Sequence, residues 1–185
     1  MAAGNAREDV YDPVTIFLHW TTAILVAIQF FLVLSPVTIR GSTPLHETIG
    51  LLILAIVPVR ILWRLTLGRR SSAGDGEPLL LRLGAKAAHG AVYALLIVIP
   101  LLGWAYSDAL ANDTYFFNIE LPMMVYYDRA LAARIYWWKQ VCAYGLLLLL
   151  FAHAGAAIAY HHIMRRDGVL RSMLPRRCRD RMFSN

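Results

Sequence analysis

The chain has 185 residues, of which 58% are hydrophobic and only 16% are charged, and its formal net charge is +6. Soluble domains carry roughly 25% charged residues, so this composition indicates a membrane protein. The positive charge does not indicate nucleic-acid binding, because the basic residues flank apolar segments instead of covering a folded surface. The length suits one domain, residues 1–185.

Four apolar segments, at about 14–34, 46–65, 88–106 and 139–160, dominate the chain. Each is long enough to cross a hydrocarbon core of about 30 Å as a helix. We therefore predict an all-α fold, an integral-membrane four-helix bundle. The longest connection, 107–136, is rich in aromatic residues and methionine. We expect it to lie in the membrane interface and to form short helices.

Lys and Arg gather on one side of the predicted membrane. That side holds Arg7, the connection between the second and third segments, and the C-terminal tail. The opposite side carries few basic residues. Because positively charged loops stay in the cytoplasm, we predict that both termini are cytoplasmic.

The side chains that can carry chemistry fall into two layers. His19, His89 and His153 lie in the half predicted to be cytoplasmic, and His46 and Lys139 lie at the outer edge. A histidine in hydrocarbon is a functional candidate by default, because lipid offers it no hydrogen-bond partner. Bis-histidine ligation of a haem iron needs two imidazoles that face each other across about 4 Å, supplied by different helices of a bundle. The alternative for each histidine is a hydrogen bond across a helix interface.

The fourth segment offers two potential ligands by itself. Lys139 lies fourteen positions before His153, which on a helix places both near one face, about 21 Å apart. This spacing suits two stacked planar cofactors. The first, third and fourth segments contain no Asp or Glu, which argues against a proton-coupled transporter. A CxxCH motif is absent, so a c-type haem is excluded.

The chain resembles the bacterial cytochrome b561 family of integral-membrane dihaem proteins. The matching stretches, in order between residues 11 and 175, are YDPVTIFLHW, LHETIGLLILAIVPVRILWRL, AAHGAVYALLIVIPLLGW and HHIMRRDGVLRSMLP. The resemblance implies a four-helix bundle in the bacterial inner membrane, with two b-type haems that exchange electrons with quinone. It implies His19 and His153 as ligands of the inner haem, and His46 as one ligand of the outer haem.

The chain departs from the family at the second ligand of the outer haem. The family has a histidine directly after a tryptophan at the start of the fourth helix, and here Trp138 is followed by Lys139. Three interpretations are open. The lysine binds the iron as the neutral amine. Or it pairs with a haem propionate while another side chain, such as a methionine of 107–136, is the sixth ligand. Or the outer haem is five-coordinate or missing.

Further candidates lie near the predicted cytoplasmic surface. Arg60 and Arg64, one turn apart, are expected to neutralise either haem propionates or lipid phosphates. His89 and His161 are candidates for hydrogen bonding to a quinone carbonyl. The alternative for these two histidines is contact with lipid headgroups.

We predict a haem b electron-transfer protein that exchanges single electrons between an outer-face partner and membrane quinone. One alternative is a non-catalytic membrane anchor and electron conduit of a larger dehydrogenase or respiratory complex. The resemblance adds a superoxide:ubiquinone oxidoreductase, for which Arg129, Arg134 and Lys139 would attract the anion. Whether the protein is an enzyme stays open; if it is, it is a quinone-linked oxidoreductase. The expected partners are lipid, quinone and an outer-face redox protein or complex subunits.

Overall fold

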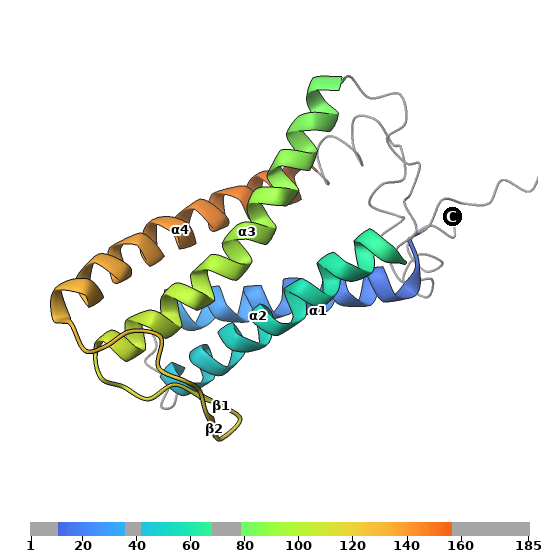
Figure 1. The fold of residues 1–185 in the computed structure, drawn as a ribbon. Coiled ribbons are helices and arrows are strands. Elements are labelled where there is room, and N and C mark those ends of the chain that lie inside the picture. The colour runs from blue at the N-terminus through green and yellow to red at the C-terminus, as the bar shows by residue number, and fades with distance from the viewer. Residues whose placement is uncertain (1–10, 36–41, 68–78, 157–185) are drawn as a thin grey trace, which may run out of the picture.

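The computed structural model describes residues 11–35, 42–67 and 79–156. In these residues four long helices follow one another, and a small hairpin separates the last two (Figure 1). The helices are α1 (Pro13–Leu34), α2 (Ser42–Thr66), α3 (Leu79–Ala109) and α4 (Arg129–Gly155). Each of the four is long and apolar enough to cross a membrane, by length and composition. The predicted all-α membrane bundle is confirmed.

The helices pack in chain order, α1 against α2, α2 against α3 and α3 against α4. Figure 1 shows α3 beside α4 and α1 beside α2, with neighbouring helices running in opposite directions. All four helices contribute to one apolar core, whose buried members are Val26, Ile49, Ile53, Val57, Leu96 and Leu146. This shared core holds the bundle together.

Many large apolar side chains point away from that core. Phe31, Leu148 and Phe151 are exposed by 62%, 71% and 69%. In water such a surface would drive aggregation. In a bilayer it costs nothing, because lipid tails are as apolar as the side chains. The exposed surface therefore agrees with a bundle that is embedded in lipid.

The start of α1 is fixed by Asp12. Its carboxylate accepts hydrogen bonds from the Thr15 backbone N–H at 2.9 Å and from the Thr15 hydroxyl at 2.6 Å, and Pro13 occupies the first turn. Such a cap satisfies backbone donors that a helix end leaves free. The same carboxylate accepts from Trp63 Nε1 at 3.2 Å. Asp12 thus joins the start of α1 to the end of α2.

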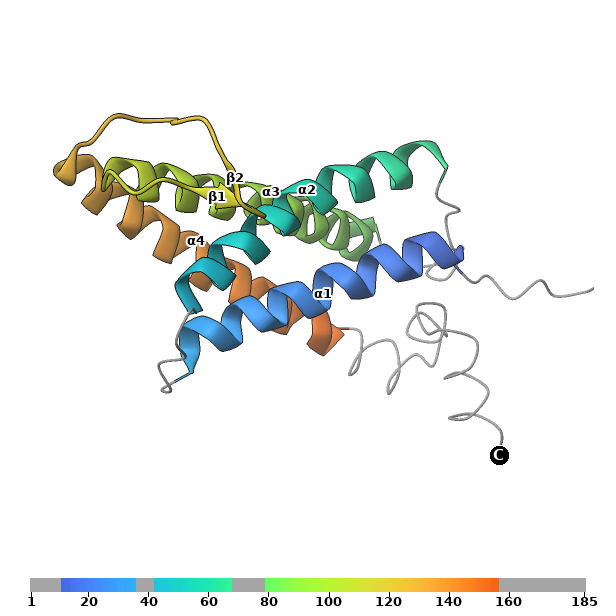
Figure 2. The same cartoon turned by 90° about the horizontal axis from the view of Figure 1, so that it is seen from below.

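The connection between α3 and α4 contains a hairpin, not the short helices that we expected. Strands β1 (Tyr115–Phe116) and β2 (Ile119–Glu120) pair antiparallel, and the turn residues Phe117 and Asn118 have φ of 47° and 68°. Two left-handed residues make a turn whose twist matches that of paired strands. β1 packs against α2, and Figure 2 shows the connection passing beside this helix.

The helices begin earlier than the predicted segments, most of all α3, which begins at Leu79, and α4, which begins at Arg129. The start of α4 is capped by Asp128, which accepts from the N–H groups of Ala130 and Leu131 at 2.8 and 3.0 Å. Hydropathy detects the part of a helix that lies in hydrocarbon, and it misses first turns in which Arg or Lys interrupts the apolar residues, as happens in α3 and α4. The predicted end of the fourth segment, near residue 160, lies outside the described residues.

The two ends of the bundle differ in what they carry. The hairpin end consists of the starts of α2 and α4, the end of α3 and the hairpin itself (Figure 1). The histidine end consists of the starts of α1 and α3 and the ends of α2 and α4, and it holds His19, His89 and His153.

Candidate functional site

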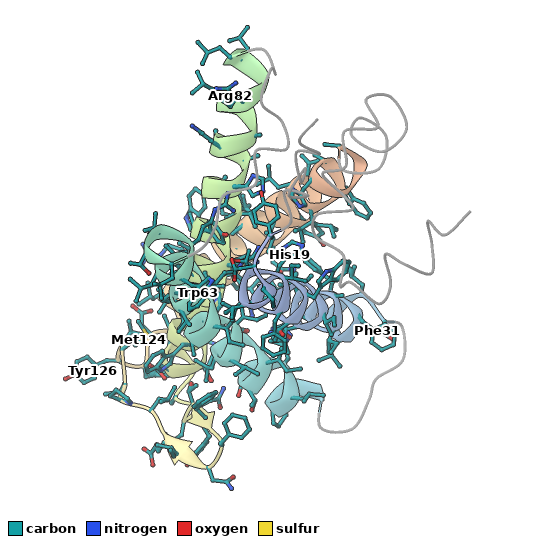
Figure 3. All side chains as sticks on the ribbon, turned by 90° about the vertical axis from the view of Figure 1, so that its right-hand side faces the viewer. His19, Phe31, Trp63, Arg82, Met124 and Tyr126 are labelled. Atoms are coloured by element: carbon teal, nitrogen blue, oxygen red, sulfur yellow. The ribbon has the colours of Figure 1, made fainter. Side chains whose placement is uncertain are left out.

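Three imidazoles from three helices meet at the histidine end. The ring centroids of His19 on α1 and His153 on α4 are 6.5 Å apart. The ring of His89 on α3 is 5.1 Å from that of His153 and perpendicular to it, at 90°. Figure 3 shows His19 near the middle of the bundle, whereas Phe31 lies at its edge. Residues separated by up to 134 positions along the chain therefore form one cluster.

The proton position on His89 follows from its hydrogen bond. The Nδ1 of His89 lies 2.7 Å from the carbonyl oxygen of Ala85, one turn earlier on α3. A carbonyl only accepts, so Nδ1–H donates, and in the neutral ring Nε2 carries no proton. A hydrogen bond of this kind orients a ring and leaves Nε2 free to accept or to bind a metal.

His19 has its ring proton on the opposite nitrogen from His89, because its hydrogen-bond partner is Arg60. Arg60 Nη2 donates to His19 Nδ1 at 2.7 Å. A guanidinium group cannot accept a hydrogen bond, so Nδ1 must accept, and the proton of the neutral ring lies on Nε2. The Arg60 guanidinium also lies over the ring of Tyr93, 5.4 Å from its centroid, a favourable cation–π distance.

Arg60 and Arg64 therefore do not act as a pair. Arg60 is half-buried and points to His19, whereas Arg64, one turn later on α2, is exposed. The spacing correctly puts both near the histidine end, but only Arg60 reaches the histidines. His161 lies outside the described residues.

The residues at the histidine end fit a haem iron held between His19 and His153. A bond from a metal to an imidazole nitrogen is about 2 Å long, so the two facing nitrogens must be about 4 Å apart. Rings with centroids 6.5 Å apart can place their nitrogens at this separation. His153 is exposed on the α4 surface, so the cofactor can reach it from the side of the bundle. The fit requires a change at His19, whose Nε2 carries a proton in the observed hydrogen-bonding state.

The second predicted pair lies at the hairpin end. His46 on α2 has a buried Nδ1 that has no hydrogen-bond partner among the described residues. Lys139 on α4 places its Nζ 6.0 Å from the Tyr106 ring centroid and 3.7 Å from the position that a Cβ on Gly103 would take. Lys139 lies within electrostatic range of both His46 and Glu47. The structure thus brings His46 and Lys139 into one neighbourhood, next to Gly103 on α3.

Two polar residues at this end were not among the predicted site residues. Gln29 on α1 donates from Nε2 to the main-chain carbonyl of His46 at 2.9 Å. Asp108 is buried in the last turn of α3 and accepts from the Met124 N–H at 2.6 Å. A lone amide within the first apolar segment is the signal that could have identified Gln29 from the sequence. Asp108 lies just beyond the predicted third segment. Its carboxylate holds the loop through the hydrogen bond from Met124, and this structural role gives no indication of proton transport.

Comparison with known proteins agrees with this geometry. Residues 10–176 match the family model described as prokaryotic cytochrome b561. Cytochrome b561 homolog 2 of Escherichia coli (strain K12) is 28% identical over 175 residues, which cover 89% of this chain and 90% of the relative. The probable superoxide oxidase CybB of Yersinia pestis is 24% identical over 176 residues, covering 90% of this chain and 97% of the relative.

A third relative is similar over nearly the same length. Cytochrome b561 homolog 1 of Escherichia coli (strain K12) is 28% identical over 177 residues, covering 90% of this chain and 98% of its own length. The family match spans all four helices, including His19, His46, His89 and His153. The chain is therefore a multi-pass membrane protein that belongs to the prokaryotic cytochrome b561 family, a family of b-type cytochromes for electron transfer.

Proposed function

We propose that this protein transfers single electrons between a partner at the hairpin end and quinone in the membrane. The observation that carries the proposal is the meeting of His19 and His153, from different membrane helices, with ring centroids 6.5 Å apart. Haem b, when bound there, supplies a one-electron couple. The chain supplies two imidazole ligands and a surrounding of low polarity.

His89 has a separate role in this proposal. Its Nδ1–H is engaged by Ala85, so its bare Nε2 accepts a hydrogen bond from a hydroxyl. A quinol offers such a hydroxyl. Because the ring of His89 lies 5.1 Å from that of His153, a quinol bound to His89 would lie next to the cofactor site. This arrangement favours quinol, the reduced form, as the species that His89 recognises.

The hairpin end would hold a second haem. His46 would provide one ligand, since its buried Nδ1 has no hydrogen-bond partner among the described residues, and Lys139 at the same end would provide the other as a neutral amine. The gathering of Lys and Arg at the other end and in the C-terminal tail supports cytoplasmic termini. The hairpin end then faces outward, where a donor or acceptor protein in solution reaches it.

Haem content tests the proposal directly. The purified chain is expected to show a Soret band and two haems per chain, with a low-spin reduced-minus-oxidised spectrum. His19→Ala and His153→Ala should each lose one haem, whereas His89→Gln should keep both, because His89 is not a ligand. A chain without a Soret band, or a full-strength band after both ligands are replaced, would contradict the proposal.

Superoxide oxidation is a second candidate, favoured by the relative from Yersinia pestis that is named a probable superoxide oxidase. Arg129 and Arg134 on the first turns of α4 are exposed at the hairpin end and would attract an anion. The isolated chain should then reduce ubiquinone with superoxide. A chain that is inactive alone but copurifies with a dehydrogenase would instead be an electron conduit of a larger complex.

A further inference from the structure

The hydrogen bond between Arg60 and His19 conflicts with metal binding by His19. Arg60 Nη2 lies 2.7 Å from His19 Nδ1, and a guanidinium group can only donate. The ring proton of neutral His19 is therefore on Nε2. A neutral imidazole binds a metal through a nitrogen that carries no proton, and the opposite nitrogen normally donates its N–H to an acceptor. His19 cannot bind iron through Nε2 while Arg60 occupies Nδ1.

His89 shows the state that ligation requires. It has the opposite proton arrangement, with Nδ1–H donated to the carbonyl of Ala85 four residues earlier. The corresponding carbonyl for His19 is that of Thr15. For His19 to reach the same state, Arg60 must leave Nδ1 and find another acceptor. Arg60 is half-buried in a membrane helix, where an unpaired guanidinium is costly.

We propose that Arg60 is a positioning residue that exchanges His19 for a propionate carboxylate when haem enters the histidine end. The inference rests on the proposed function, in which His19 is a haem ligand. The Arg60–His19 hydrogen bond breaks, the ring proton moves from Nε2 to Nδ1, and Nε2 becomes the ligand. The guanidinium then pairs with the carboxylate, an acceptor that matches its two parallel donors. No proton leaves the site.

In this exchange a propionate helps the protein to take up haem, in addition to stabilising haem that is already bound. Without a carboxylate, the acceptor left beside Arg60 is the hydroxyl of Tyr93, a buried and uncharged group. This acceptor is weaker than a carboxylate, so Arg60 leaves His19 less readily and His19 stays in the state that cannot bind iron. A haem whose propionates are esterified should therefore be captured slowly by the natural chain. Removal of Arg60 should abolish this difference, since His19 is then free to change its proton position.

The experiment compares uptake of haem and of haem dimethyl ester. The full chain carries His46→Ala, which confines the signal to the histidine end, and is purified from cells grown with limited haem so that sites remain unfilled. Uptake into lipid nanodiscs is followed by growth of the low-spin Soret band. Arg60→Met keeps most of the apolar stem, and Arg64→Met is the matched control, because Arg64 is exposed one turn later on the same helix.

With Arg60 present, haem should be captured roughly tenfold or more faster than the ester, the ratio expected from one charge-assisted hydrogen bond. Arg64→Met should keep this ratio, and Arg60→Met should bring it to about one while raising the rate for the ester. The comparison of ratios removes effects of solubility and of general loss of fold. If Arg60→Met does not give a folded chain by circular dichroism, Arg60→Gln takes its place.

Two results would contradict these expectations. An equal haem-to-ester ratio in the Arg60 and Arg64 variants would overturn the exchange while leaving haem binding intact. A chain with Arg60 that takes up neither compound, in a preparation that is folded, would overturn the proposed function itself. The two failures are thus distinguishable.

Discussion

The side-chain amide of Gln29 on α1 donates a hydrogen bond to the main-chain carbonyl of His46 on α2, at 2.9 Å. The contact lies beside Gly50, one turn after His46, where a Cβ would lie 3.1 Å from Gln29 Nε2 and would require the amide to shift by a few tenths of an ångström. Small residues allow helices in membranes to approach closely and to form such polar contacts. Gln29 thus fixes the backbone that carries His46.

Substitution of Gly50 tests this contact. In Gly50→Ala the added methyl group requires the amide of Gln29 to shift by a few tenths of an ångström, which should weaken its hydrogen bond to His46 and cost about 0.5–1.5 kcal/mol relative to the control. Gly145→Ala on α4 is the matched control, because a Cβ there meets nothing within 4 Å. Alanine should leave the control unchanged or stabilise it by up to about 1 kcal/mol. Unfolding in SDS, followed by circular dichroism, measures both, and equal effects would contradict the contact.

Lys139 decides the ligand set at the hairpin end. Lys139→Ala should lose the low-spin signal of the second haem and keep that of the first, and Lys139→His should restore the signal because imidazole is a common haem ligand. Reduced-minus-oxidised spectra with haem content per chain provide the measurement. Two haems with an unchanged low-spin spectrum in Lys139→Ala would rule out the amine as a ligand. A single haem in the natural chain would remove the site at the hairpin end.

The link between Asp12 and Trp63 should stabilise the histidine end. Asp12→Ala removes a helix cap and the acceptor of Trp63 Nε1, which should cost about 1–2 kcal/mol. Trp63→Phe removes the indole N–H together with part of the ring, and should cost about 1 kcal/mol for the hydrogen bond in addition to the lost packing. The temperature at which the Soret band is lost reports both. Because the two residues share one bond, the double variant should lose less than the sum, and strict additivity would argue against the link.

Asp108 should hold the hairpin connection in place. Its buried carboxylate accepts from the Met124 N–H at 2.6 Å, a charge-assisted bond, and Asp108→Asn should weaken the anchor by about 1–3 kcal/mol. Chymotrypsin should then cut faster near Tyr126, which is 81% exposed and points away from the bundle (Figure 3). Asp113→Asn, an exposed acid nearby, is the control.

Chymotrypsin cleavage near Tyr126 also tests the orientation of the chain in the membrane. Spheroplasts expose the outer face of the membrane, whereas inverted vesicles expose the cytoplasmic face. If the termini are cytoplasmic, cleavage near Tyr126 should occur in spheroplasts. Cleavage confined to inverted vesicles would reverse the predicted topology.

Much of the fold could be predicted because membrane helices carry a strong local signal. A run of apolar residues as long as the bilayer is thick is enough to specify a helix, since the backbone must satisfy its own hydrogen bonds in lipid. The start of α1 at Asp12 and Pro13 also has the residue types that a helix N-terminus favours. The starts of α3 and α4 were placed too late, because Arg and Lys interrupt the apolar residues of their first turns, and hydropathy does not then distinguish a helix from a loop. The hairpin was missed because left-handed conformations at Phe117 and Asn118 have only a weak sequence signal.

The sequence by itself determined the four helices, the depth of each histidine along its helix and the absence of a histidine at Lys139. These properties are local or follow from the thickness of the bilayer. Only the tertiary structure decided that Arg60 turns inward to His19 while Arg64 stays exposed, and that Gln29 reaches the backbone of His46. Which helix faces meet, and therefore which donor finds which acceptor, depends on how α1, α2, α3 and α4 pack, and this is set by contacts between residues that are distant in the chain.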